Sequence, residues 1–249
     1  MRTKTTSKES RKTDLPDDLS AKDILVYLKS HASPENVTGM ARYGINPERN
    51  YGVCTPILFD VAKRAKGNHK LAQELWDSGV RDARLVACFM DDPAKVTGEQ
   101  MDDWVKDFNS WDVCDGCCIH LFSRTKEAHT KARQWSASDE EYVKRAGYVM
   151  MATLVVHDKK APDSLFRAYL PLMVKGATDE RNYVKKAVSW ALRVVGQRST
   201  QLNKEAIRTA ERIRKLDSKA AKWIASDALR ELGSDKVKTR LRKREESLH

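Results

Sequence analysis

The 249-residue sequence lacks the features that mark several protein classes. No run approaches the roughly 18–20 continuous apolar residues that a membrane-spanning helix needs. The polar N-terminus MRTKTTSKESRKTD has no apolar segment of a secretory signal. No P-loop, dinucleotide-binding glycine pattern or metalloprotease histidine pair is present, and patterns typical of strands are nearly absent. The sequence therefore predicts an all-α protein of the cytoplasm, with no membrane partner and no cofactor.

Cysteine is scarce, and its odd count of five argues against a framework of disulfides. We therefore expect reduced thiols, as in a cytosolic protein. Cys114, Cys117, Cys118 and His120 raise the alternative of a zinc site, but they share one predicted helix and no second ligand pair exists. We expect these cysteines to be small buried hydrophobic residues. No metal site is predicted.

Positive charge is abundant but confined to half of the chain. Residues 1–124 carry 18 Lys and Arg against 19 Asp and Glu, whereas residues 125–249 carry 28 against 16. Such asymmetry favours a polyanionic partner, most simply nucleic acid. A basic surface with a charged tail is the alternative, since the segment KVKTRLRKR at 236–244 supplies six of these charges.

Apolar periodicity and capping signals predict a chain of short helices with brief connections. Thr55 with Pro56 resembles an N-cap followed by proline, and Thr97 to Gln100 resembles a capping box. We expect a basic tail over 1–18, one helical domain over 19–233, and a charged C-terminal tail over 234–249. The helices are expected near 20–30, 55–66, 68–78, 81–90, 98–109, 111–122, 124–135, 139–156, 163–174, 180–196, 203–215 and 218–232.

Five of these helices resemble one another at their starts, which are Val80, Val113, Val143, Val184 and Ala221. Most of them begin with a small apolar residue and a basic residue, and they are separated by 33, 30, 41 and 37 residues. That spacing is typical of two-helix solenoid units, which bury their apolar faces by stacking. The predicted fold is thus a HEAT-like helical-repeat superhelix, with an irregular helical bundle as the alternative.

The repeat register brings chemically distinct residues to one predicted surface. Equivalent positions in stacked repeats point the same way, and residues four apart share a helix face. We therefore expect one concave surface to carry Trp111, Asp115, Arg145, Lys186 and Trp190. Cations there suit phosphates and indole rings suit a base or sugar. A carboxylate among them suits a positively charged ligand, such as an oxocarbenium-like sugar.

Structural roles remain as alternatives at each of these positions. Tryptophans at helical spacing often belong to a core, and an Asp and an Arg on neighbouring helices often form only a salt bridge. Asp112 lies off the face of Asp115, so capping or a salt bridge is favoured there. Lys159 and Lys160, after the helix ending near His157, suit either a phosphate or the helix dipole.

Three segments carry a resemblance to a known family. Trp111-Asp-Val-Cys-Asp115 is similar to the Trp-Asp-x-x-Asp motif of the AlkD-like alkylpurine DNA glycosylases. Val143-Lys-Arg145-Ala and Lys186-Ala-Val-Ser-Trp190-Ala-Leu-Arg193 resemble later segments of that family in the same order. The likeness spans roughly residues 35–232. It implies a HEAT-like superhelix that cups duplex DNA and releases cationic alkylpurines without metal or nucleotide.

The resemblance also implies roles for individual residues. Asp115 would be the catalytic carboxylate, and Trp111 and Trp190 the aromatic contacts to the lesion. Arg145 would contact DNA, and the cations nearby on the same segments, Lys144, Lys186 and Arg193, would join it. The expected partner is duplex DNA containing alkylated bases, bound by a monomer.

The sequence departs from the family near its first repeats. Met40-Ala-Arg-Tyr-Gly-Ile45 and Tyr51-Gly-Val-Cys-Thr-Pro56 replace a segment rich in Asn and Phe, and Gly116-Cys117-Cys118 continues the Trp-Asp motif. These departures indicate a divergent subgroup. Two other functions therefore stay open: a nucleic-acid-binding repeat protein without catalysis, and a scaffold for protein interactions.

Overall fold

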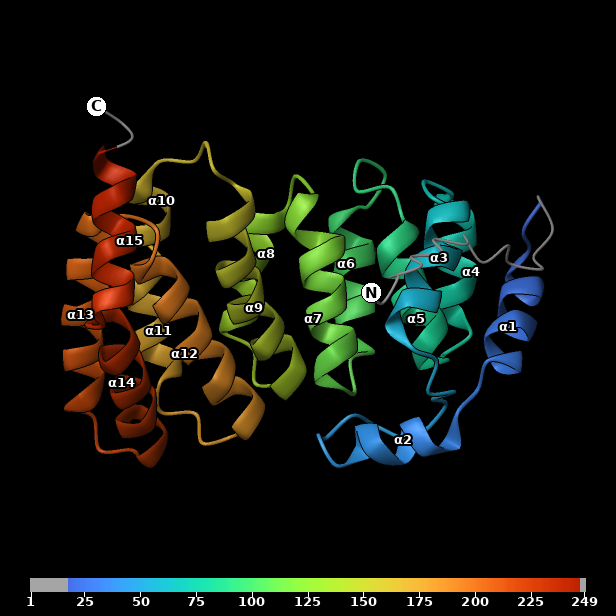
Figure 1. Ribbon diagram of the computed structural model, residues 1–249, viewed down its shortest axis with the longest axis horizontal. Helices are drawn as coiled ribbons and strands as arrows, with labels where there is room; N and C mark the ends of the chain where they lie inside the picture. Colours follow the sequence, from blue (N-terminus) through green and yellow to red (C-terminus); the bar gives the residue numbers. More distant parts are fainter. Residues whose placement is uncertain (1–17, 247–249) are drawn as a thin grey trace, which may run out of the picture.

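The computed structural model describes residues 18–246, and every regular element in that range is a helix (Figure 1). The all-α prediction is confirmed. The basic tail predicted for residues 1–18 lies outside the described residues, apart from Asp18. No helix within 18–246 is long and apolar enough to cross a membrane.

The helices form two layers. One layer is a row in which each helix packs against the next: α3 (Thr55–Arg64), α5 (Arg81–Met90), α7 (Trp111–His120), α9 (Glu141–His157), α12 (Asn182–Gly196) and α14 (Lys219–Leu232). The second layer lies behind this row in Figure 1 and comprises α4 (His69–Asp77), α6 (Gly98–Lys106), α8 (Ala128–Ser136), α10 (Asp163–Arg167), α11 (Leu170–Gly176) and α13 (Thr200–Arg214). The remaining elements are α1 (Ala21–Ser30), α2 (Pro34–Ala41), the short 3₁₀ helix Phe122–Arg124 and α15 (Asp235–Glu246).

The front row confirms the repeat alignment made from the sequence. The five similar segments open α5, α7, α9, α12 and α14, which are consecutive members of the row. Stacking buries the apolar stripe that each unit could not cover alone. Val113, Val184 and Ala221 are accordingly buried at their helix starts.

The core between the layers is continuous and depends on close helix contacts. The indoles of Trp76 and Trp104 stack with their centroids 4.1 Å apart. Gly147 lets α9 approach α8, because an added Cβ would lie 2.3 Å from the backbone nitrogen of Ser136. A larger residue at Gly147 would therefore force the two layers apart.

Local signals were right at some helix ends and wrong at others. The Thr97 side chain accepts a hydrogen bond from the Gln100 backbone, as expected of an N-cap. Thr55 is not an N-cap: it is the first helical residue, and Cys54 in extended conformation precedes it. The single helix expected over 163–174 is divided into α10 and α11, because Pro171 cannot donate the backbone hydrogen bond that would continue it.

Two helices carry features that periodicity does not display. No residue of α2 is buried, so the segment has no apolar stripe to reveal it. Its start does have a local signal, since the Ser33 side chain caps α2 with Pro34 at the first position. The tail expected after Gly233 contains α15, whose Val237 and Leu241 are buried, and this helix packs against α13 and α14.

The cysteines differ from the expectation of reduced thiols. Cys88 in α5 and Cys117 in α7 form a disulfide, with Cα atoms 5.1 Å apart. The expectation is wrong for this pair because stacking of two consecutive repeats brings the two side chains together. Cys114 and Cys118 are free and buried, as predicted for small hydrophobic residues.

Candidate nucleic-acid interface

Asp115 and Arg145 form a two-point ion pair between adjacent helices of the front row. Arg145 donates from Nε to one carboxylate oxygen at 2.8 Å and from Nη2 to the other at 2.7 Å. Their side chains retain only 16% and 8% of their exposure, respectively. Parallel hydrogen bonds of this kind hold a carboxylate in one orientation.

Burial and charge act in opposite directions on this pair. Burial raises the pKa of Asp115, whereas the charge and hydrogen bonds of Arg145 lower it, and the net shift is upward. Burial also works against the charge of Arg145, but Asp115 outweighs it, so the pKa of Arg145 is raised. The opposite charge of each partner favours the charged form of the other.

Trp111 lies one turn before Asp115 and is joined to a distant part of the chain. Its indole Nε1 donates a 2.9 Å hydrogen bond to the carbonyl oxygen of Tyr43, in the loop after α2. The same loop is attached to the start of α7 by the Asn46 backbone, which donates to Ser110 Oγ at 3.3 Å. Figure 1 shows this end of α2 beneath the lower end of α7.

Tyr183 connects the loop after α2 to the ion pair, and sequence reasoning missed it. Its carbonyl oxygen accepts a 2.8 Å hydrogen bond from Arg145 Nη1, and its hydroxyl donates to the Gly44 carbonyl at 3.2 Å. The ring of Tyr142 stacks on it with centroids 5.6 Å apart. The only signal was that Tyr142 and Tyr183 each immediately precede the aligned valine of their repeat.

The remaining predicted site residues are on the expected helices but in different surroundings. Lys186 is exposed and Trp190 is half-buried against the core. Lys144 pairs with Asp179 at 3.1 Å. Arg193 is held by two carboxylates of α14, from Asp227 and Glu231. The structure therefore brings Trp111, Asp115 and Arg145 together, and it packs Trp190 against the core.

The residues around the ion pair differ in their surroundings. Asp112 forms a salt bridge with Arg81 of α5 at 2.6 Å, as favoured from its position. Within residues 18–246, no group of three or more His, Cys, Asp or Glu side chains is placed to hold a metal ion. Helix α9 ends at His157, and Lys159 and Lys160 beyond it are exposed.

The comparison with protein families decides the relationship. A family model described as DNA alkylation repair enzyme matches residues 24–232. The chain belongs to this family. The matched residues include every helix from α3 to α14, and with them the ion pair and Trp111.

Two individual proteins are similar to the chain at low sequence identity. The uncharacterized protein Lin0241 of Listeria innocua serovar 6a is 25% identical over 169 residues, which is 67% of this chain and 73% of that protein. A solved structure is described as "A new family of proteins related to the HEAT-like repeat DNA glycosylases with affinity for branched DNA structures". It has a TM-score of 0.71 and 21% identity, and covers 86% of this chain and 97% of its own. This likeness shows the fold, and the predicted HEAT-like repeat architecture is confirmed.

Proposed function

We propose that this family member binds duplex DNA along α7, α9 and α12 and excises positively charged alkylpurines such as 7-methylguanine and 3-methyladenine. The observation that carries the proposal is Asp115, a carboxylate fixed by Arg145 one turn from the half-buried Trp111. A cationic base leaves its deoxyribose readily, and the sugar then develops positive charge. A carboxylate held in place stabilises that charge without having to reorganise.

The carboxylate of Asp115 can still accept further hydrogen bonds, although Arg145 already donates two to it. A carboxylate offers about four acceptor sites, and the two hydrogen bonds from Arg145 use one on each oxygen. The remaining sites suit an attacking water or the sugar itself. In this mechanism Asp115 is the catalytic residue, and it works as an electrostatic stabiliser or by orienting water.

Arg145 acts in this proposal chiefly by positioning Asp115. All three of its nitrogens already donate hydrogen bonds, Nε and Nη2 to Asp115 and Nη1 to the carbonyl of Tyr183. Its side chain is only 8% exposed. Lys186, which is exposed on the next helix of the row, is better placed to meet a phosphate. Lys144 and Arg193 would have to exchange their acidic partners for a phosphate before they could contribute.

Binding of DNA without excision is the second candidate, and two observations favour it. The guanidinium of Arg145 is paired with Asp115 and opposes the negative charge that this carboxylate would offer to a sugar. The structural neighbour is described by its affinity for branched DNA rather than by excision. In this alternative the ion pair only joins α7 to α9, and the exposed cations supply the affinity.

Single-turnover release of 7-methylguanine from a methylated duplex tests the proposal, with DNA binding measured in parallel. The Asp115→Asn protein should lose on the order of a hundredfold or more in rate and still bind DNA. Asp112→Asn is a matched control, because it also breaks a buried ion pair of α7, to Arg81. It should retain excision.

The outcomes separate the three functions. Excision by Asp115→Asn at the wild-type rate would contradict the catalytic role. A wild-type protein that binds DNA and releases no base from any alkylated duplex would support the second candidate. A protein that binds no DNA would point to a scaffold for other proteins.

A further inference from the structure

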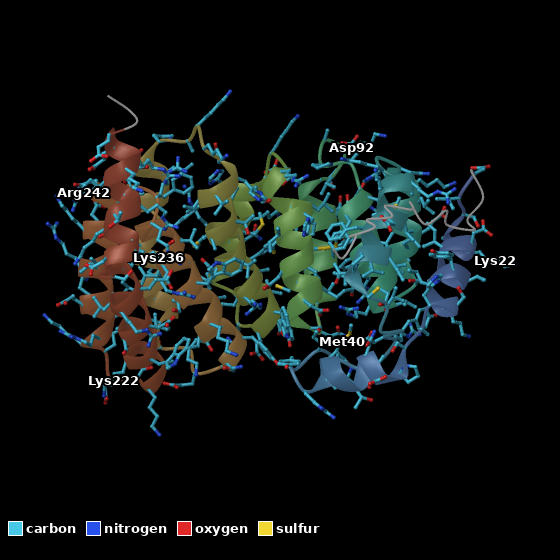
Figure 2. All side chains as sticks on the ribbon, in the orientation of Figure 1. Lys22, Met40, Asp92, Lys222, Lys236 and Arg242 are labelled. Carbon is cyan, nitrogen blue, oxygen red and sulfur yellow. A yellow bond between two sulfur atoms is a disulfide. The ribbon has the colours of Figure 1, made fainter. Side chains whose placement is uncertain are left out.

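A cavity of about 800 Å³ lies between α2, the loop that follows it and Trp111. Its lining combines two aromatic rings, Tyr43 and Trp111, with the thioether of Met40. Polar groups at its wall come from Asn36, Thr38, Glu35 and Arg42. Figure 2 shows Met40 on the side of α2 that lies toward α7. The cavity thus borders the candidate site but is built mainly by a segment outside the repeats.

Hydrogen bonds hold the backbone beside this cavity, whereas the side chain of Tyr43 is exposed. Trp111 and Tyr183 donate hydrogen bonds to the carbonyls of Tyr43 and Gly44, respectively. Gly44 has a φ of +77°, and an added Cβ would lie 1.7 Å from the Tyr183 hydroxyl oxygen. Tyr43 nevertheless remains 77% exposed. An aromatic ring displayed in water from an anchored backbone is prepared for contact with a flat, partly apolar ligand.

The groups around the cavity match the parts of one unpaired nucleotide. Every nucleobase has a face that stacks on aromatic rings, here Tyr43 and Trp111. Asn36 already donates to the Gly52 carbonyl and Thr38 to the Pro34 carbonyl. Their side-chain oxygens and the carboxylate of Glu35 can still accept hydrogen bonds from the amino or imino groups of a base. The exposed Arg42 supplies a cation for the adjoining phosphate.

We infer that this cavity receives an unpaired nucleobase of bound DNA, at a bulge, flap or branch, stacked on Tyr43 and Trp111. The inference rests on the proposed function, since the DNA must lie along α7 for a base to reach α2. It adds a site of recognition that depends on the absence of pairing rather than on alkylation. The protein would then bind branched or bulged DNA in preference to an intact duplex.

Two probes of equal length test the inference with the full chain. One is an intact duplex, and the other carries a single unpaired 2-aminopurine, whose fluorescence falls when it stacks. The wild-type protein should bind the bulged DNA about tenfold more tightly and quench its fluorescence, as expected for one stacked base. Tyr43→Ala should remove the preference and the quenching, and leave affinity for the intact duplex unchanged.

Phe59→Ala is the matched control, because Phe59 is another exposed aromatic residue of the same molecule but lies on α3, outside the cavity lining. It should keep both the preference and the quenching. Equal binding of the two probes without quenching would overturn the inference and leave the proposed DNA binding intact. The same holds if Tyr43→Ala behaves as the wild type. Failure to bind either probe would overturn the proposed function together with this site.

Discussion

Arg145 on α9 holds Asp115 on α7 through two hydrogen bonds of 2.8 and 2.7 Å, and also donates to Tyr183 at the start of α12. One guanidinium therefore joins three consecutive helices of the front row. The segment Trp111-Asp-Val-Cys-Asp115 resembles a catalytic motif. Its Asp115 has a structural role, because the ion pair with Arg145 joins α7 to α9. Tests at this position must separate loss of chemistry from loss of stability.

Asp115→Asn should lower the free energy of unfolding as well as the rate of excision. The amide can accept from only one of the two Arg145 donors, and its own N–H groups then face the guanidinium. Breaking one partner of a buried pair costs up to about 3–5 kcal/mol, and we expect about 1–3 kcal/mol because Asn retains one acceptor. Urea unfolding measures the change.

Asp112→Asn should cost a similar amount, since its pair with Arg81 is buried to a similar extent. If Asp115→Asn loses excision while both variants unfold at similar urea concentrations, the catalytic loss cannot be attributed to unfolding. An Asp115→Asn protein as stable as the wild type would contradict the structural role of the pair.

Gly44→Ala should disturb the loop after α2, and Tyr183→Phe should partly restore it. The added Cβ would lie 1.7 Å from the Tyr183 hydroxyl oxygen but 3.0 Å from the ring carbon that bears it. Removing the hydroxyl therefore relieves the worst contact, although the positive φ of Gly44 still disfavours alanine. The double variant should be more stable than the sum of the two single changes predicts. Simple additivity in thermal unfolding would show that the loop is not held against Tyr183.

Acid should remove a contribution of Asp179 to stability. Hydrogen bonds from Arg181, and then from Lys144, lower the pKa of Asp179 from 3.8 to about 2. A carboxyl group with a depressed pKa in the folded state stabilises it above the unfolded value, and that stabilisation is lost as the pH falls toward the folded value. The stability difference between the wild type and Asp179→Asn should thus be constant above about pH 5 and shrink between pH 4 and pH 2. A difference independent of pH would exclude this ion pair as its source.

The Cys88–Cys117 disulfide should make folding stability sensitive to reductant. It closes a loop with a sequence separation of 29, which corresponds to about 3–4 kcal/mol from the restricted unfolded chain. Dithiothreitol should therefore lower the melting temperature of the wild type but not of the Cys88→Ala/Cys117→Ala variant. Thiol titration of the denatured, unreduced protein should find the three free cysteines Cys54, Cys114 and Cys118. A count of five would exclude the disulfide.

DNA binding should weaken steeply with salt, and the cations of α12 should contribute more than those of α15. Figure 2 shows the labelled Lys222, Lys236 and Arg242 at the end of the array that carries the C-terminus, away from Asp115 in the sequence order of the repeats. Lys186→Gln should reduce the slope of log affinity against log salt by about 0.9, as for one phosphate contact. Neutralising Lys236, Arg242 and Lys243 together should change the slope less. The reverse result would assign binding to the C-terminal helix.

Charge variants suit this question better than a truncation after Gly233. Val237 and Leu241 of α15 are buried against the last repeats. Removing the helix would uncover apolar surface as well as remove charge, whereas substitution at its exposed cations leaves the packing intact.

Local sequence determined the repeat architecture of this protein and one half of its site. Apolar stripes at helical spacing can be buried only by stacking, so the aligned starts at Val113, Val143 and Val184 were sufficient to place α7, α9 and α12 in one row. The same register placed Asp115 beside Arg145, because equivalent positions of neighbouring repeats face the same way. These features depend on short-range periodicity, which the sequence displays directly.

Only the tertiary structure decided what surrounds that pair. Helix α2 buries none of its residues, so no apolar pattern in the sequence predicts it. The loop after it forms hydrogen bonds with α7 and α12, between residues that are 68 and 139 positions apart in the chain. Cys88 and Cys117 likewise meet only because α5 and α7 stack. Contacts of this kind depend on where a backbone carbonyl or a sulfur atom lies in space, and no periodicity in the sequence encodes that position.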